Sequence, residues 1–239
     1  MIVRLVLEFL NGASVTLKEK SPQEILEWAA KNFPNEIAAS SSFQTQSVPL
    51  LHMIASTVPQ LPILFIDTGY HFPETIAFRD RLVHSWNLNL EVLTVRNSME
   101  EGLWYANQPL YLTNPDLCCE IHKVAPMREA MRRYRVWISG IRRDQSHTRA
   151  KADIVEVSKE NRIRIHPMLE WTQSDVQQYV RNHGLPEHPL DVLGYVSIGC
   201  APCTRPPLTG GGLRSGRWQG TGKTECGLHT HLRDVSKKN

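Results

Sequence analysis

The sequence predicts an α/β fold with a mostly parallel sheet flanked by helices. Short apolar segments of strand length alternate along the chain with longer segments of helical periodicity. One strand-length segment, residues 63–66, is continuously apolar, which is typical of a parallel strand buried on both faces. Such an alternation indicates an open sheet whose strands are connected through helices.

Local signals place the individual elements. Ser21 and Glu24 are spaced as a capping box around Pro22, which favours the first helical position, and Gly184 is placed to end the last helix. In chain order we expect a helix over 22–33, a strand over 36–40, a helix over 48–58, a strand over 63–66, a helix over 73–86, a strand over 90–95, a helix over 123–134, strands over 136–139 and 163–167, and a helix over 172–183.

The chain divides into two parts by composition. Residues 1–207 carry the periodic segments and are predicted to form one α/β domain. Residues 208–239 are rich in glycine and lack periodicity, which predicts a flexible C-terminal arm with a hinge at 210–212. No segment approaches the ~20 apolar residues that a membrane-spanning helix requires.

The overall charge does not indicate a nucleic-acid binder. The composition, with 41% hydrophobic and 21% charged residues, is that of an ordinary globular protein, and the net charge is only +3. The arginines are unevenly placed, however, and this favours binding of an anion at one place. They gather at Arg132, Arg133, Arg135, Arg142, Arg143 and Arg149.

The five cysteines fall into two pairs and one single residue. Cys118 and Cys119 are adjacent, Cys200 and Cys203 are two residues apart, and Cys226 stands alone. Four thiolates suit zinc or an iron–sulfur cluster, and the lone thiol suits nucleophilic or redox chemistry. Adjacent ligands approach one small ion awkwardly, whereas a cluster offers separate irons, so the spacing favours the cluster over a Cys₄ zinc site.

An odd cysteine count would also fit two disulfides and a free thiol in a secreted protein. The N-terminal segment argues against this, because Arg4 and Glu8 interrupt it and no signal-peptide cleavage pattern follows. Adjacent cysteines also bridge each other with difficulty. We therefore expect reduced thiols and a cytoplasmic protein.

Polar loops follow the predicted strands, at the sheet edge where open α/β folds bind ligands. A serine-rich loop occupies 40–47, Asp67 and Gly69 follow the next strand, and the loop over 140–149 carries three arginines. Guanidinium groups match the oxygens of sulfate and phosphate, which predicts an anion site. The alternatives are a solvated serine turn and a surface network in which Arg142 or Arg143 pairs with Asp144.

A set of short motifs is specific when read together. They lie at 42–43, 67–69, 117–119 with Lys123, 140–146, 197–204, 214–218 and 225–229. Over most of its length the chain resembles the iron–sulfur type of assimilatory adenylyl-sulfate reductase in the phosphoadenylyl-sulfate reductase family. The resemblance implies a modified adenine-nucleotide α-hydrolase fold, in which residues 1–207 bind the nucleotide and contain the cluster site. It also implies a role in sulfate assimilation and cysteine biosynthesis.

The resemblance implies a reaction and its partners. The Cys226 thiolate would attack the sulfur of adenylyl sulfate, release AMP and form an S-sulfocysteine, from which thioredoxin or a similar dithiol protein would release sulfite. A [4Fe–4S] cluster would be held by Cys118, Cys119, Cys200 and Cys203. The arm would close over the substrate and then expose Cys226 to the reductant. We also expect a homo-oligomer, with no nucleic-acid or membrane partner.

The same resemblance assigns the other site residues. Lys123, Arg214 and Arg217 would stabilise the developing charge, and His229 would orient the Cys226 loop or a phosphate. Lys123 follows Cys119 at helical spacing, which would place its ammonium between cluster and substrate. The substrate-binding residues, some from the loops and some from the resemblance, are Ser42, Gln44, Ile66, Asp67, Gly69, Gly140, Arg142, Arg143 and Arg149.

Two alternatives remain at the level of sequence. The substrate could carry a 3′-phosphate, in an enzyme specific for that nucleotide or one that accepts both. The first loop, 43–47, departs from the family pattern, and the arginine loop is one residue shorter than in many relatives. The other alternative is a zinc-stabilised module whose arginines bind nucleic-acid phosphates.

Overall fold

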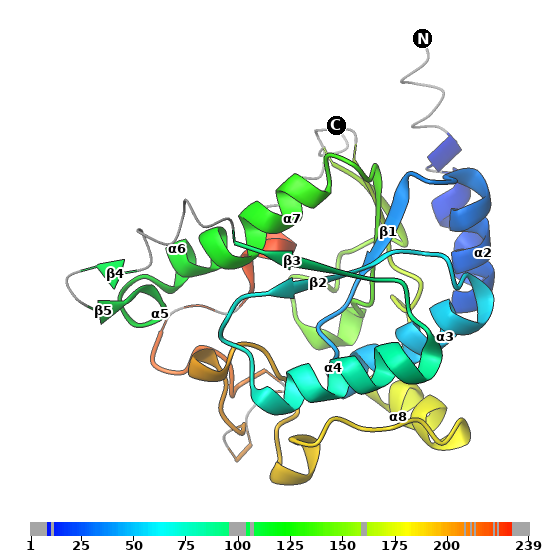
Figure 1. Cartoon of the computed structure of the whole chain (residues 1–239). Coiled ribbons are helices and arrows are strands. Elements are labelled where there is room, and N and C mark those ends of the chain that lie inside the picture. The colour runs from blue at the N-terminus through cyan, green and yellow to red at the C-terminus, as the bar shows by residue number, and fades with distance from the viewer. Residues whose placement is uncertain are drawn as a thin grey trace.

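The computed structural model describes residues 9–10, 12–95, 104–105, 108–158, 162–207, 209–210, 212, 214–221, 223 and 225–230. A six-stranded sheet forms the centre of the fold (Figure 1). Its strands, in spatial order, are β3 (Leu90–Thr94), β2 (Ile63–Asp67), β1 (Ile37–Ser40), β6 (Val136–Ser139), β8 (Ile163–Ile165) and β7 (Val155–Val157). All neighbouring pairs are parallel except β7 with β8, so the predicted α/β fold with a mostly parallel sheet is confirmed.

Helices cover both faces of this sheet. The larger core lies under α2 (Pro22–Asn32), α3 (Val48–Thr57), α4 (Pro73–Trp86) and α8 (Gln173–Asn182). The smaller core lies on the other face under α7 (Ala125–Ala130). Successive strand residues point to opposite faces, so Ile63 and Phe65 enter the larger core while Leu64 enters the smaller one.

The capping signals of the sequence are present at the helix ends. The Ser21 hydroxyl accepts the backbone N–H of Glu24, and the Glu24 carboxylate accepts the backbone N–H of Ser21 in return. Helix α4 has the predicted bounds and ends at Asn87, which takes the left-handed conformation with φ 48°. Gly184, with φ 57°, follows the C-terminal end of α8 as expected.

The helix expected over 123–134 differs in both bounds. It begins at α6 (Pro115–Cys119), continues through a π-helical turn (Glu120–Val124) and ends with α7. The start was missed because the Asn114 side chain is the cap, accepting the N–H of Leu117 at 3.0 Å. A π-helical turn is rare and is frequent at functional sites, and this one lies between Cys119 and Lys123.

Several short elements were not predicted. They are β4 (Trp104–Tyr105), β5 (Gln108–Pro109), α5 (Leu110–Thr113), the antiparallel strand β7, the short helix α9 (Gly227–Thr230), and the 3₁₀ turns Leu17–Glu19, Thr45–Ser47, Arg143–Gln145, Asp191–Leu193 and Ala201–Cys203. Residues 12–16 are also helical. The strand expected over 163–167 ends at Ile165. In the described ranges, no helix is both long and apolar enough to cross a membrane.

The described residues beyond 207 fold back onto the main body. Thr204 and Arg217 form a β-bridge, and the N–H of Arg205 donates to the carbonyl of Gly216 at 2.8 Å. A Cβ at Gly216 would collide with the Arg205 carbonyl, so this approach requires glycine. Helix α9 packs against the π-helical turn, and Leu228 contacts the smaller core. This packing brings Cys226 close to the sheet.

Candidate active site

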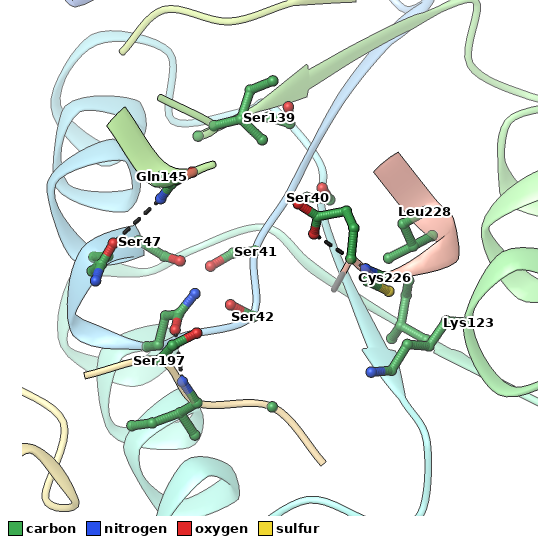
Figure 2. A pocket seen from close by; sticks show the side chains of 18 of the residues that line it. Ser40, Ser41, Ser42, Ser47, Lys123, Ser139, Gln145, Ser197, Cys226 and Leu228 are labelled. Atoms are coloured by element: carbon green, nitrogen blue, oxygen red, sulfur yellow. Dashed lines mark hydrogen bonds between the residues drawn. The ribbon is translucent and has the colours of Figure 1, made fainter. Parts of the chain in front are cut away.

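A cavity opens at the carboxyl ends of β1, β2 and β6 (Figure 2). The parallel pairing of β1 with β6 places Ser40 opposite Ser139, so both strands end at the same level of the sheet. The serine-rich loop after β1 forms one wall, and the segment around Ser197 lies near it. Gln44 joins these two walls, because its side-chain oxygen accepts the backbone N–H of Ile198 at 3.0 Å.

The structure brings many of the predicted site residues to this cavity. Those lining it are Ser42, Gln44, Ile66, Lys123, Gly140, Arg149, Arg214, Arg217 and Cys226. They come from five separate segments of the chain, and Figure 2 shows Cys226, Leu228 and Lys123 on the same side. His229 belongs to α9, but its side chain lies outside the described part of the structure.

Asp67 and Gly69 do not line the cavity. The Asp67 carboxylate accepts the N–H of Gly69 at 2.9 Å, and Gly69 has a positive φ of 72°. These contacts build the turn after β2 and leave the adjacent Ile66 to face the cavity.

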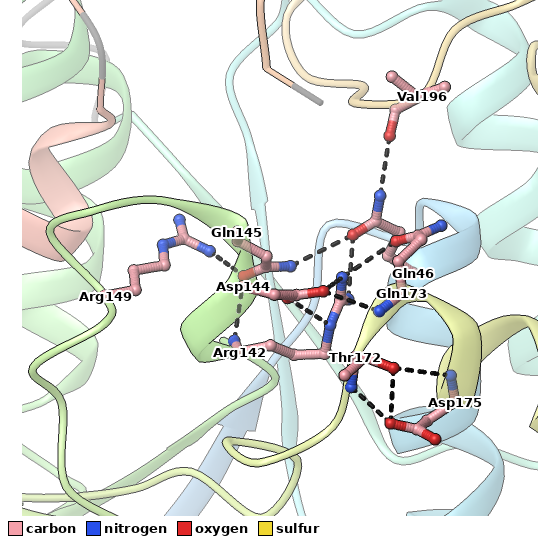
Figure 3. A network of polar contacts seen from close by, with 9 residues as sticks. All are labelled: Gln46, Arg142, Asp144, Gln145, Arg149, Thr172, Gln173, Asp175 and Val196. Atoms are coloured by element: carbon pink, nitrogen blue, oxygen red, sulfur yellow. Dashed lines mark hydrogen bonds and ion pairs between the residues drawn. The ribbon is translucent and has the colours of Figure 1, made fainter. Parts of the chain in front are cut away.

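Arg142 and Arg143 do not line the cavity either. Arg142 is fully buried and donates to Asp144, Gln46 and Gln173, at 3.0 Å each (Figure 3). Arg143 is bound by Glu170 and by two backbone carbonyls. Arg142 therefore pairs with Asp144, which was one of the two alternatives open at the level of sequence. The pair belongs to a network around the buried Arg142 side chain and not to a surface network. Of the three arginines in this loop, Arg149 is the one that lines the cavity.

Cys226 is half-buried and lines the cavity beside two cationic groups. A hydrogen bond from Cys119 lowers its pKa well below the usual value; burial opposes this, and the charges of Lys123 and Arg217 lower it further. The same hydrogen bond and burial raise the pKa of Cys119. The two nearby cations, Lys123 and Arg217, therefore favour the thiolate form of Cys226.

Lys123 lies between the cavity and the paired cysteines. Burial lowers its pKa, but the sulfur atoms of Cys200, Cys226 and Cys119 outweigh that effect and raise the pKa above its usual value. The side chain is therefore an ammonium ion at neutral pH. Its position on the π-helical turn, directly after the Cys118–Cys119 pair, allows it to face both groups.

The four paired cysteines share a second, small cavity next to the first. It is lined by Tyr70, Tyr111, Pro115, Cys118, Cys119, His122, Lys123, Cys200, Pro202 and Cys203. All four thiols are free, and the Thr68 hydroxyl lies 3.3 Å from the sulfur of Cys200. Burial raises the pKa of Cys118 to about 11 and also raises that of Cys203. Buried thiols of this kind become thiolates when a metal group supplies the compensating charge.

This donor set fits an iron–sulfur cluster in its chemistry, since it consists of thiols without carboxylates. Among the residues that the structure describes, no three His, Cys, Asp or Glu side chains converge as a site for one metal ion. The four cysteines are thus candidates for holding a cluster.

Glu225 and Ser139 are among the cavity residues to which the sequence alone assigns no role. Glu225 is buried, and its carboxylate is bound by Arg149 and Arg214. The Ser139 hydroxyl contacts His166 at 2.9 Å, and the other ring nitrogen of His166 faces Glu156 at 3.4 Å. Both cavity residues are sequence neighbours of assigned ones, Cys226 and Gly140, and this adjacency was the available signal.

Comparison with known proteins agrees with this geometry. Residues 36–206 match the family model described as "Phosphoadenosine phosphosulfate reductase domain". The adenosine 5′-phosphosulfate reductase of Streptomyces coelicolor is 42% identical over 214 residues, which cover 89% of this chain and 90% of that protein. These similarities cover the sheet, the serine loop and both cysteine pairs.

Solved structures show the same architecture. The phosphoadenylyl-sulfate reductase of Candida auris, in a phosphate complex, superposes with a TM-score of 0.72 at 30% identity, covering 83% of this chain and 97% of that one. The FMN adenylyltransferase of Candida glabrata reaches 0.60 at 16% identity, covering 84% and 66%, and so shares the fold alone. The prediction of an adenine-nucleotide α-hydrolase type of fold is confirmed.

Proposed function

This chain belongs to the phosphoadenosine phosphosulfate reductase family of oxidoreductases, and on that premise we propose that it reduces adenylyl sulfate to sulfite and AMP in sulfate assimilation. The observation that carries the proposal is the position of the Cys226 thiol in a cavity that is also lined by Lys123, Arg149, Arg214 and Arg217. A nucleophile and a set of cations lining one cavity are what attack on a phosphosulfate anion requires. The substrate itself is taken from the names of the relatives.

In the first step, the Cys226 thiolate attacks the sulfur atom of the phosphosulfate. A bond forms between the two sulfur atoms, the bond from sulfur to the bridging oxygen breaks, and its electron pair leaves on the phosphate of AMP. Lys123, Arg214 and Arg217 reduce the repulsion between two anions and then stabilise the charge on the departing phosphate. The product on the protein is an S-sulfocysteine at Cys226.

In the second step, a dithiol protein such as thioredoxin attacks the Cys226 sulfur and releases sulfite. The mixed disulfide is resolved by the second thiol, which restores the Cys226 thiol and leaves the partner oxidised by two electrons. This step requires Cys226 to reach the protein surface, so we propose that residues 208–239 act as a mobile arm. Five free cysteines fit a reducing compartment, and we place the reaction in the cytoplasm.

Cys118, Cys119, Cys200 and Cys203 would hold a [4Fe–4S] cluster. When bound, the cluster would place the charges of its iron and sulfide ions beside Lys123. Cys119 would then be a ligand and no longer a hydrogen-bond donor to Cys226. The charges of Lys123 and Arg217 remain in that state and continue to favour the Cys226 thiolate. Iron and acid-labile sulfide analysis of anaerobically purified protein tests the assignment, and a single zinc per chain would contradict it.

The substrate is tested by turnover of adenylyl sulfate and of its 3′-phosphorylated form, with a dithiol reductant in both assays. We expect sulfite release with adenylyl sulfate to be the faster reaction. A higher kcat/KM for the 3′-phosphorylated nucleotide would reassign the substrate. The Cys226→Ser variant is the control in both assays, because sulfite that it still releases does not come from the proposed intermediate.

A further inference from the structure

The cation site of the cavity already contains an anion supplied by the chain itself. The Glu225 carboxylate is only 5% exposed and accepts hydrogen bonds from Arg149 Nε at 3.2 Å, Arg149 Nη2 at 2.9 Å and Arg214 Nη2 at 2.9 Å. Burial alone would raise the pKa of Glu225, but the charges of Arg149 and Arg214 outweigh it and lower the pKa. The carboxylate is therefore ionised at neutral pH.

Glu225 occupies the N–H groups that a ligand anion would need. Arg149 uses its Nε and Nη2 fork on this carboxylate, and its remaining Nη1 donates to Gln145. The fork is the part of a guanidinium that binds a carboxylate or a phosphate in bidentate fashion. Since Arg149, Arg214 and Glu225 all line the cavity, a phosphoryl or sulfuryl group entering there meets arginines that are already bound.

Arg214 is held less completely than Arg149. Its Nη2 bonds to Glu225, while its Nε is buried and has no hydrogen-bond partner among the described residues. Burial lowers its pKa to about 10, so it remains a cation at neutral pH. A half-buried guanidinium with an unpaired Nε favours an anion with more acceptor oxygens than one carboxylate supplies, as a phosphate or sulfate has.

We propose that Glu225 is an internal anion that occupies the Arg149–Arg214 pair in the free enzyme and that the anionic group of the nucleotide displaces it. The proposal rests on the proposed function, because it takes the nucleotide to be the ligand of this cavity. Glu225 is then a positioning residue for Cys226. Its Oε1 also accepts the backbone N–H of Cys226 at 3.1 Å, so displacement of the carboxylate moves the adjacent thiol.

Besides helix α9, which follows Cys226 and packs against the π-helical turn, this segment has two described anchors, and the displacement acts on one of them. Three residues before Cys226, Lys223 pairs with Asp116 at the start of α6. Glu225 provides the second anchor through Arg149, Arg214 and a 3.4 Å contact with Ser146. Loss of the second anchor leaves Cys226 attached near the site but free to change its orientation. Substrate binding and thiol movement are thereby coupled through one carboxylate.

The affinities of AMP and adenosine test the proposal, because only AMP carries the competing anion. We expect calorimetry on the full chain to give about 10-fold tighter AMP binding for Glu225→Gln than for wild type. This factor follows if the Glu225 carboxylate occupies the arginines in about nine tenths of the free wild-type molecules, because only the remaining tenth can then bind AMP directly. Adenosine affinity should not change. The matched control is Glu129→Gln, which removes a carboxylate from an exposed pair with Arg132 and should change neither affinity.

Unchanged or weaker AMP binding by Glu225→Gln, with adenosine binding intact, would overturn the proposal and make Glu225 a structural partner of the arginines. If neither ligand binds wild type, the nucleotide function fails and the proposal fails with it. Loss of adenosine binding in Glu225→Gln alone would indicate misfolding. In that case the proposal is tested on the wild-type protein by the rate at which iodoacetamide alkylates Cys226. The rate should be higher with AMP bound than with adenosine bound, and an equal or lower rate with AMP would contradict the proposal.

Discussion

Arg142 and Arg214 differ in how completely the protein satisfies them. Arg142 is fully buried and donates to three surrounding side chains, so each of its three guanidinium nitrogens is hydrogen-bonded within the fold (Figure 3). Among the described residues, Arg214 bonds to the Glu225 side chain and leaves its Nε unpaired, and it lines the cavity. Internal pairing, rather than position in a basic motif, separates the structural arginine from the one that is available to a ligand.

The largest effect on the cavity side of this comparison is expected for Cys226→Ser. Turnover should fall by at least about 10³-fold, because a serine hydroxyl is a poor nucleophile where a thiolate is required. AMP affinity and thermal stability should stay close to wild type. Activity within tenfold of wild type would remove Cys226 from the chemistry.

Arg214→Gln should lower kcat/KM by about 10²-fold, the typical cost of losing one donor to a developing charge. The melting temperature should change little, because Arg149 still pairs with Glu225. A variant that melts well below wild type and keeps its kcat/KM would reverse the comparison with Arg142.

Lys123→Ala should raise the pKa of Cys226, because it removes a positive charge that favours the thiolate. The pH dependence of Cys226 alkylation measures this directly. The alkylation rate should begin to rise at a higher pH in the variant than in wild type, because the variant lacks the ammonium charge that favours the thiolate. Iron content serves as the control for an intact cysteine site, and an unchanged profile would contradict the electrostatic role.

Arg142→Met should lower the stability of the protein and not act directly on catalysis. Removal of this buried cation deprives Asp144, Gln46 and Gln173 of one hydrogen-bond donor each and should cost roughly 3 kcal/mol of unfolding free energy. Denaturant unfolding measures the loss. A stable variant with strongly impaired nucleotide binding would instead place Arg142 in the substrate site.

The smallest effect is expected for Arg143→Gln. Its partner Glu170 is 48% exposed, and exposed ion pairs contribute only about 0–1 kcal/mol. Both kcat/KM and the unfolding midpoint should stay near wild type. A loss of activity as large as that of Arg214→Gln would restore the original assignment of Arg143 to the substrate.

The sequence predicted the sheet and its main helices because their signals are local. Pro73 at the first helical position and the apolar run at 63–66 fixed α4 and β2. The start of the cysteine-bearing helix was misplaced because its cap, Asn114, follows a short element that has no periodicity. Strand β7 was missed because a three-residue segment is too short to show alternation.

The candidate site was predictable as a set of residue types but not as a set of contacts. Arg142, Arg143 and Arg149 look equivalent in the sequence, and the carboxylates and amides that distinguish them come from distant segments. Glu225 next to Cys226 gives no local signal that it would be buried between two arginines. Tertiary partners decide these roles, and a single sequence does not contain them.

The most direct measurement is mass spectrometry of the full-length protein after incubation with adenylyl sulfate in the absence of any dithiol. We predict that AMP is released once per chain and that a peptide containing Cys226 gains the mass of one sulfonate group. Subsequent addition of thioredoxin should remove the group and release sulfite. Turnover of adenylyl sulfate without any adduct on Cys226, or with the adduct on another cysteine, would contradict the account.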